Sequence, residues 1–151
     1  MPQDFIPPVA FYFSVEVVGG SNGDDARFQE VSGIEMELEL EEIAEGGLNS
    51  HKHRLPSRTR YSNLVLKRGY LHTSSSLADW CKQALQSNSA YGSNMTKNIK
   101  VSLLDERGSV LTMWEFTRAL PVKWSISNFN AQENALVLET LEFSYQTFTV
   151  N

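Results

Sequence analysis

The segment Ile34–Glu41 alternates between apolar and acidic residues, and this pattern constrains the fold of the chain more than any other. Successive side chains of a β-strand point to opposite faces, so the alternation predicts a strand with two different sides. The apolar side carries Ile34, Met36, Leu38 and Leu40, and the acidic side carries Glu35, Glu37, Glu39 and Glu41. A regular row of carboxylates is typical of a face in contact with water.

Further alternating segments predict that most of the chain is antiparallel β-structure. Strands are expected at Val9–Val18, Arg27–Glu42, Tyr61–Lys67, Ile99–Leu104, Val110–Arg118 and Ala135–Val150, with an interruption at Gly33. The turn DERGS at 105–109 makes a hairpin of two of them. The segment SSSLADWCKQALQS, at 74–87, has the serine cap and the apolar stripe of a helix. The predicted fold class is mainly β, an antiparallel β-sandwich or barrel with one flanking α-helix, in a single domain spanning 1–151.

The same alternation selects the side chains that we expect in the core. They are Phe13, Val15, Leu38, Leu64, Val101 and Trp114 from the strands, with Leu77 and Trp80 of the helix packed against them. The chain has 151 residues, which is long enough to bury such a core.

The segment Ile43–Arg60 has no sustained period and contains two adjacent glycines and a proline. Irregular loops longer than about 12–15 residues are uncommon in compact domains and are usually functional. We therefore predict an assembly arm at about 43–60, which packs poorly on its own subunit and reaches a neighbouring one. Its expected assembly residues are Glu45, Gly46, Gly47, Leu48, Asn49, His51, Leu55, Pro56 and Arg58. A mixed connection is expected at Pro121–Asn134.

Composition and charge exclude several classes of function. The net charge of −5 argues against a general nucleic-acid binder, which needs a basic surface to neutralise phosphates. We expect no membrane span, because no run of 18 apolar residues is present. The N-terminal residues lack the pattern of a secretory signal, and a single cysteine, Cys81, suits a reducing cytoplasm. Folding in the cytoplasm is therefore expected.

No group of residues points to catalysis, a cofactor or a metal. A zinc site would need three or four ligands, and His51, His53 and His72 are more simply polar loop residues. Cys81 lies on the apolar stripe of the predicted helix, so a packed thiol is the simpler interpretation than a nucleophile. A regular strand face does not wrap a calcium ion, and it does not place one carboxylate in the apolar surroundings that acid–base catalysis requires. The sequence therefore predicts no enzyme, no cofactor and no metal.

A family resemblance runs through nearly the whole chain. It rests on F-x-E-V-S-G from Phe28 to Gly33, E-G-G-x-N from Glu45 to Asn49, and L-K-R-G from Leu66 to Gly69. The later segments LADWCKQ, VSLLDERGSVLTMWEFTRALPVKW and NALVLETLEFSYQTF continue it in order. With these segments, the chain resembles the inner tube proteins of contractile-tailed phages and of the related bacteriocins and extracellular injection systems, which share a fold with Hcp proteins.

The resemblance implies a structural protein that forms stacked hexameric rings with a central channel. The implied partners are further copies of the chain, a contractile sheath protein, baseplate or hub proteins and a tube-terminating cap. A cargo effector protein or DNA would pass through the lumen. The finished assembly would be a phage virion or an extracellular injection particle.

In such a ring, the row formed by Glu35, Glu37, Glu39 and Glu41 would face water, and we expect it to line the channel. The alternative places it on the outer surface, against basic residues of a sheath. Two other functions remain open: an Hcp-like ring protein of a type VI-like secretion system that carries effectors, and an enzyme or small-ligand barrel. Electron microscopy separates the three, because they would give long tubes, isolated rings and monomers respectively.

Overall fold

The structure is a computed structural model that describes residues 11–19, 25–44, 52–70, 75–87, 96–127 and 137–151. In chain order the elements are β1 (Tyr12–Val17), β2 (Asp25–Phe28), β3 (Glu30–Ser32), β4 (Met36–Ala44), β5 (Lys52–Tyr61), β6 (Leu64–Gly69), α1 (Ser76–Gln86), β7 (Lys97–Leu104), β8 (Val110–Ile126), β9 (Leu138–Ser144) and β10 (Thr147–Val150). The predicted β-fold with one flanking helix is confirmed.

Eight strands form one antiparallel sheet in the order β2-β1-β7-β8-β9-β6-β3, with β10 also paired to β8. The long strand β8 connects the two halves of this sheet. Its first part, up to Ala119, pairs with β7, and its second part, from Leu120, pairs with β9. Arg118, just before this change of partner, has a positive φ of 51°, and its backbone N–H donates to the Asn98 side chain. A strand that changes sheets at an irregularity is a usual corner of β-sandwiches.

Strand β8 is longer than the predicted strand Val110–Arg118 and takes up the first part of the mixed connection predicted at Pro121–Asn134. The strand continues through Pro121 to Ile126. Proline has no backbone N–H, and a sheet accepts it where the pairing is already irregular. The register between β8 and β9 shifts between Pro121 and Lys123, which provides such a place. Residues 128–136 lie outside the described residues.

The core lies between the two halves of the folded sheet, and α1 packs against it. Its fully buried strand residues include Val15, Leu64, Leu66, Ile99, Val101, Phe116, Leu141 and Phe143. Leu77, Trp80 and Cys81 of α1 are buried with them, and the Trp80 ring stacks on Phe143 with centroids 5.5 Å apart. The helix begins at the predicted serines, because the Ser75 side chain accepts a hydrogen bond from the Ala78 backbone N–H at 3.1 Å.

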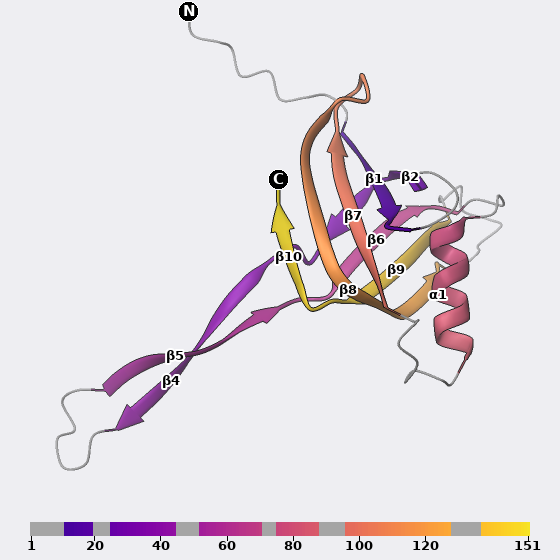
Figure 1. The fold of residues 1–151 in the computed structure, drawn as a ribbon. Coiled ribbons are helices and arrows are strands. Elements are labelled where there is room, and N and C mark those ends of the chain that lie inside the picture. Colours follow the sequence, from indigo (N-terminus) through magenta and orange to yellow (C-terminus); the bar gives the residue numbers. More distant parts are fainter. Residues whose placement is uncertain (1–10, 20–24, 45–51, 71–74, 88–95, 128–136) are drawn as a thin grey trace, which may run out of the picture.

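The predicted core is largely confirmed. Val15, Leu64, Val101, Leu77 and Trp80 are buried, while Phe13 and Trp114 are partly buried against the core. The prediction for Leu38 is wrong, since 52% of its surface is exposed. It lies on β4, which pairs only with β5 in a separate two-stranded sheet. Figure 1 shows β4 and β5 projecting together from the rest of the protein, on the side away from α1.

Candidate functional site

Strands β4 (Met36–Ala44) and β5 (Lys52–Tyr61) form the feature that most needs a partner, and we call them the ribbon. They pair antiparallel from Met36 opposite Tyr61 to Ala44 opposite Lys52. Nine residues of strand extend about 30 Å at the usual rise per residue. Within the described part of the chain, the two strands contact each other along their length and touch the sandwich little. A two-stranded ribbon is only marginally stable in water unless something packs on it.

This ribbon corrects the prediction of an irregular arm at 43–60. Residues 52–60 of that range form most of β5, which pairs with β4 inside the same subunit. The sequence signal was present but short: Ser57, Thr59 and Tyr61 alternate with Arg58 and Arg60. Leu55, Pro56 and Arg58 lie on this strand. The other predicted assembly residues, Glu45, Gly46, Gly47, Leu48, Asn49 and His51, lie outside the described residues.

One face of the ribbon carries a row of exposed apolar side chains. Met36, Leu38 and Leu40 are 58%, 52% and 52% exposed. Their partners across the ribbon are Tyr61, Thr59 and Pro56. Large apolar side chains arranged in a row and left half in water are typical of a surface that another chain covers.

The opposite face carries the predicted row of carboxylates, but it is not simply acidic. Arg60 is paired with Glu37 in the register, so arginines of β5 share this face. The Arg58 Nε donates to a Glu39 carboxylate oxygen at 2.9 Å, and an Arg60 nitrogen lies 3.8 Å from the other oxygen. The hydrogen bond to Glu39 raises the pKa of the Arg58 guanidinium above its usual value. Because both arginines are largely exposed, such ion pairs add little to stability.

The ribbon as a whole is neutral. Its strands contain four glutamates and four lysines or arginines. The predicted row of glutamates is present on this face, and β5 supplies cations beside it. The sequence analysis missed these because it treated Arg58 and Arg60 as part of an irregular segment.

A β-bulge interrupts the ribbon beside Glu39. The register shifts between Leu38, which pairs with Thr59, and Leu40, which pairs with Pro56. Ser57 and Arg58 therefore lie opposite Glu39 alone. Beyond the bulge, Leu55 pairs with Glu41, so an apolar side chain joins the charged face. The Ser57 hydroxyl donates to the Glu41 carboxylate at 3.3 Å.

Two short segments join the ribbon to the sandwich, and we call them the root: residues 33–35 before β4 and residues 61–63 at the end of β5. Gly33 has a φ of +87°, and a Cβ at this position would lie 1.7 Å from the Asn63 carbonyl oxygen. Only glycine fits so close a backbone contact in this conformation. The predicted interruption at Gly33 is confirmed, and it separates β3 from β4.

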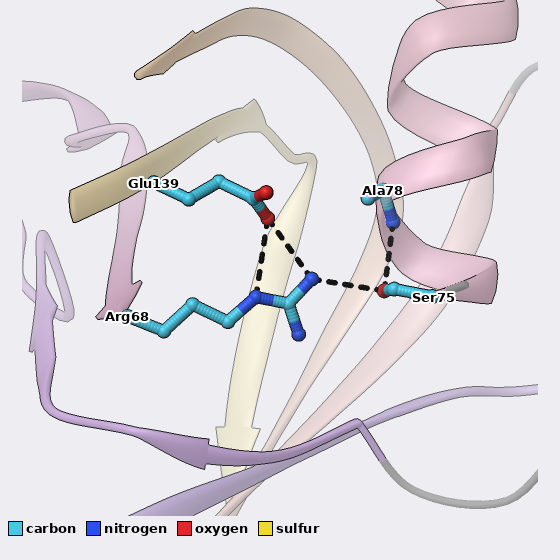
Figure 2. Close-up of polar contacts among 4 residues, drawn as sticks. All are labelled: Arg68, Ser75, Ala78 and Glu139. Atoms are coloured by element: carbon cyan, nitrogen blue, oxygen red, sulfur yellow. Dashed lines mark hydrogen bonds and ion pairs between the residues drawn. The ribbon is translucent and has the colours of Figure 1, made fainter. Parts of the chain in front are cut away.

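A buried ion pair anchors the start of α1, and the sequence analysis did not identify it. The Arg68 guanidinium donates to one Glu139 oxygen from Nε at 3.1 Å and from a terminal nitrogen at 2.9 Å. That terminal nitrogen also donates to the Ser75 hydroxyl at 2.9 Å (Figure 2). Arg68 and Glu139 occupy positions in β6 and β9 that the alternating pattern assigns to the buried face of each strand. A charged residue at such a position was the sequence signal that could have identified the pair. These contacts join β6, β9 and the start of α1, so we assign the cluster to the fold.

Other classes of site receive no support from the described residues. These residues contain no group of three or more His, Cys, Asp or Glu side chains placed to hold a metal ion. The one helix in the described ranges is too short to span a membrane. Cys81 is buried with the core-facing side of α1.

Comparison with known proteins gives a consistent result. Residues 9–149 match the family described as T4-like virus tail tube protein gp19. No curated protein sequence matches the chain. A chain in the cryo-EM structure of the anti-feeding prophage (AFP) baseplate, 6-fold symmetrised, is 30% identical, with 93% of this chain and 91% of that chain covered and a TM-score of 0.75.

Two further solved structures have a similar fold. A chain of the sheath–tube complex of an extracellular contractile injection system, PVC, in its extended state, is 22% identical over 98% of this chain and 93% of that chain, with a TM-score of 0.73. Hcp1 from Flavobacterium johnsoniae is 20% identical over 93% and 94% of the two chains, with a TM-score of 0.58.

Proposed function

Since this chain belongs to the T4-like virus tail tube protein family, we propose that six copies close into a ring and that the rings stack into the inner tube of a contractile injection particle. The observation that carries this proposal is the ribbon, an ordered pair of strands whose two faces are both exposed in the single subunit. The 6-fold symmetry of the AFP baseplate, which contains a chain 30% identical to this one, supports the number six.

The ribbon is the proposed stacking arm. Contact with another chain at Met36, Leu38 and Leu40 would stabilise the assembly, since burying apolar surface contributes about 25 cal/mol per Å². A neighbouring copy is the natural cover in a homo-oligomer. Leu55, Pro56 and Arg58 lie on the ribbon, and Glu45, Gly46, Gly47, Leu48, Asn49 and His51 complete the proposed assembly set.

We place the row of Glu35, Glu37, Glu39 and Glu41 on the wall of the channel. Arg58 and Arg60 beside Glu39 make this wall one of mixed charge. A hydrated wall with both signs offers neither a large apolar patch nor a strong single-sign field to a passing cargo. The proposed cargo is an effector protein or DNA.

The proposed partners are those of a complete contractile particle. The AFP and PVC structures with similar chains are described as a baseplate, a tube-terminating cap and a sheath–tube complex. By analogy, this chain would contact a sheath protein, baseplate or hub proteins and a cap. We propose assembly in the bacterial cytoplasm and a final place in an extracellular particle or virion. A structural subunit of this kind needs no catalytic site.

Electron microscopy of two matched variants tests the proposal. Leu38→Thr with Leu40→Thr removes apolar contact from the ribbon but leaves side chains suited to strands, so the subunit should stay folded and fail to form tubes. Val122→Thr is the control, because Val122 is similarly exposed, at 40%, on β8 outside the ribbon. Normal tubes from the ribbon variant, with and without baseplate proteins, would contradict the assignment of the arm.

An Hcp-like secreted ring that carries effectors is the second candidate, and the likeness of fold to Hcp1 favours it. The same micrographs distinguish it from the first. Single rings or short stacks in the presence of baseplate proteins would support the second candidate, and long tubes would support the first.

A further inference from the structure

The direction in which the ribbon leaves the sandwich is set at the root by contacts between distant parts of the chain. Gly33 presses against the backbone of Asn63, so the two strands are held side by side where they enter the sandwich. The Glu35 backbone N–H donates to the Gly33 carbonyl at 2.9 Å, and the Ser62 hydroxyl donates to the Glu35 carboxylate. The root therefore has its own hydrogen bonds, separate from those along the ribbon.

The corner between β9 and β10 holds this root in place. Tyr145 lies at that corner, and its hydroxyl donates to the Gly33 carbonyl at 3.2 Å. The Tyr61 hydroxyl lies 3.1 Å from the Thr147 hydroxyl oxygen, so the second strand of the ribbon is held as well. Each strand of the ribbon is thus connected by one tyrosine to the last part of the chain.

Aromatic packing stiffens the same contacts. The Tyr145 ring meets Tyr61 edge to face at 5.8 Å, Phe116 at 4.9 Å and Phe148 at 6.0 Å. Phe116 is fully buried on β8, and Phe148 is buried on β10. Edge-to-face aromatic pairs add stabilisation beyond the area that they bury. Tyr145 and Tyr61, the last residue of the ribbon, are therefore held by aromatic rings that belong to the core.

We propose that Tyr145 and Tyr61 are positioning residues for the ribbon and that β10 acts as a clamp on its root. In the single subunit, they hold the ribbon at one angle before any neighbour is present. Preorganisation of this kind lowers the entropy that association must overcome. The angle matters because the ribbon is long: a turn of about 10° at the root moves the end of a strand about 30 Å long by about 5 Å.

The proposal rests on the proposed function only in treating the ribbon as an assembly arm. It differs from the sequence-based expectation of an arm that packs poorly on its own subunit, because here contacts within the subunit hold the base of the arm. It also assigns a role to β10, which pairs with β8 and is not part of the ribbon.

Electron–electron distance measurements on dispersed, monomeric subunits test this directly. Spin labels are attached to cysteines introduced by Arg54→Cys, at an exposed position beyond the bulge, and by Lys123→Cys, at an exposed position of β8 outside the ribbon. Cys81 is fully buried and stays unlabelled. The subunit with the native root should give a narrow distance distribution. Tyr145→Phe keeps the ring and removes the donor to Gly33, and it should widen the distribution at least twofold.

Tyr12→Phe is the matched control, since it removes a tyrosine hydroxyl on β1, far from the root in the sequence, and should leave the width unchanged. Thr147→Val removes the hydroxyl partner of Tyr61 with almost no change in shape, and it should also widen the distance distribution. It replaces Tyr145→Phe as the test if urea denaturation shows that Tyr145→Phe is poorly folded. The proposal is wrong if Tyr145→Phe and Thr147→Val both give distance distributions as narrow as that of the control. The distance measurement needs only the monomer, so a chain that never forms tubes can still support the clamp at the root. The proposed clamp and the proposed tube function can therefore be contradicted separately.

Discussion

Tyr145 should lose its proton much later than an ordinary tyrosine. Burial of the phenol, with smaller contributions from Tyr61 and from the Glu35 carboxylate, raises its pKa to about 12. In the unfolded chain the pKa is about 10. Because the folded value is the higher one, the neutral phenol stabilises the fold fully below pH 10, and this stabilisation is lost as the pH rises through 12.

The difference in ultraviolet absorbance between the native chain and Tyr145→Phe isolates this titration. We expect tyrosinate at position 145 to form near pH 12 in the folded protein and near pH 10 in urea. A midpoint near 10 for the folded protein would mean that the ring is open to water. The hydrogen bond to Gly33 would then be absent for much of the time.

Glu139 should be far more sensitive to substitution than its neighbour Glu142. Replacing Glu139 by Gln leaves the buried guanidinium of Arg68 without its counter-charge, which costs about 3–5 kcal/mol in the free energy of unfolding. Glu142→Gln, on the other face of β9 and only partly buried, should cost under about 1 kcal/mol. Urea denaturation measures both, and equal small losses would show that the pair in Figure 2 contributes no more than a surface ion pair.

Among the elements, α1 was the easiest to predict, because cap and stripe are both local signals. Ser75 caps it and Trp80 is buried against the core, as the sequence indicates. Strand β5 was the hardest, because its partner and its bulge are not local. A strand that faces water on both sides has no apolar alternation for the sequence to reveal, and Pro56 further hides it.

Trp80→Ala should cost about 3–5 kcal/mol in stability, as expected for the loss of a large buried ring. Leu85→Ala on the same helix is the control, and it should cost under about 1 kcal/mol because Leu85 is 41% exposed. Thermal or urea unfolding of both variants gives the comparison. If Trp80→Ala loses less than 1 kcal/mol, the helix does not pack as described.

At the scale of the molecule, the sequence predicted the fold class and the family, because both depend on strand patterns spread over the whole chain. It did not predict how the charges balance. The row of glutamates was visible in β4, but the arginines beside Glu39 became visible only once β5 was placed opposite it. The prediction that Leu38 lies in the core was wrong because its strand, β4, projects from the sandwich, and the sequence does not show this.

The channel assignment predicts a selective defect. Changing Glu37 and Glu39 to Gln leaves Arg58 and Arg60 without their carboxylates and gives the ribbon a net charge of about +2 by the count of its ionised side chains. If the row lines the channel, cargo loading or ejection should change while sheaths still polymerise on the tubes.

Glu16→Gln with Glu106→Gln is the control, since it removes the same charge from exposed positions outside the ribbon. A loading assay measures how much cargo the tubes contain, and electron microscopy shows whether sheaths polymerise on them. Tubes that fill normally but no longer carry a sheath would place the glutamates on the outer surface instead.

The bulge beside Glu39 also affects how the length of the ribbon can change during evolution. An extra residue in one paired strand normally turns every later side chain to the wrong face. A bulge confines the extra residue to one place and leaves the remaining pairs in register. Ser57 and Arg58 occupy such a place. Lineages related to this chain should therefore gain or lose a single residue there more readily than at any other position along the arm.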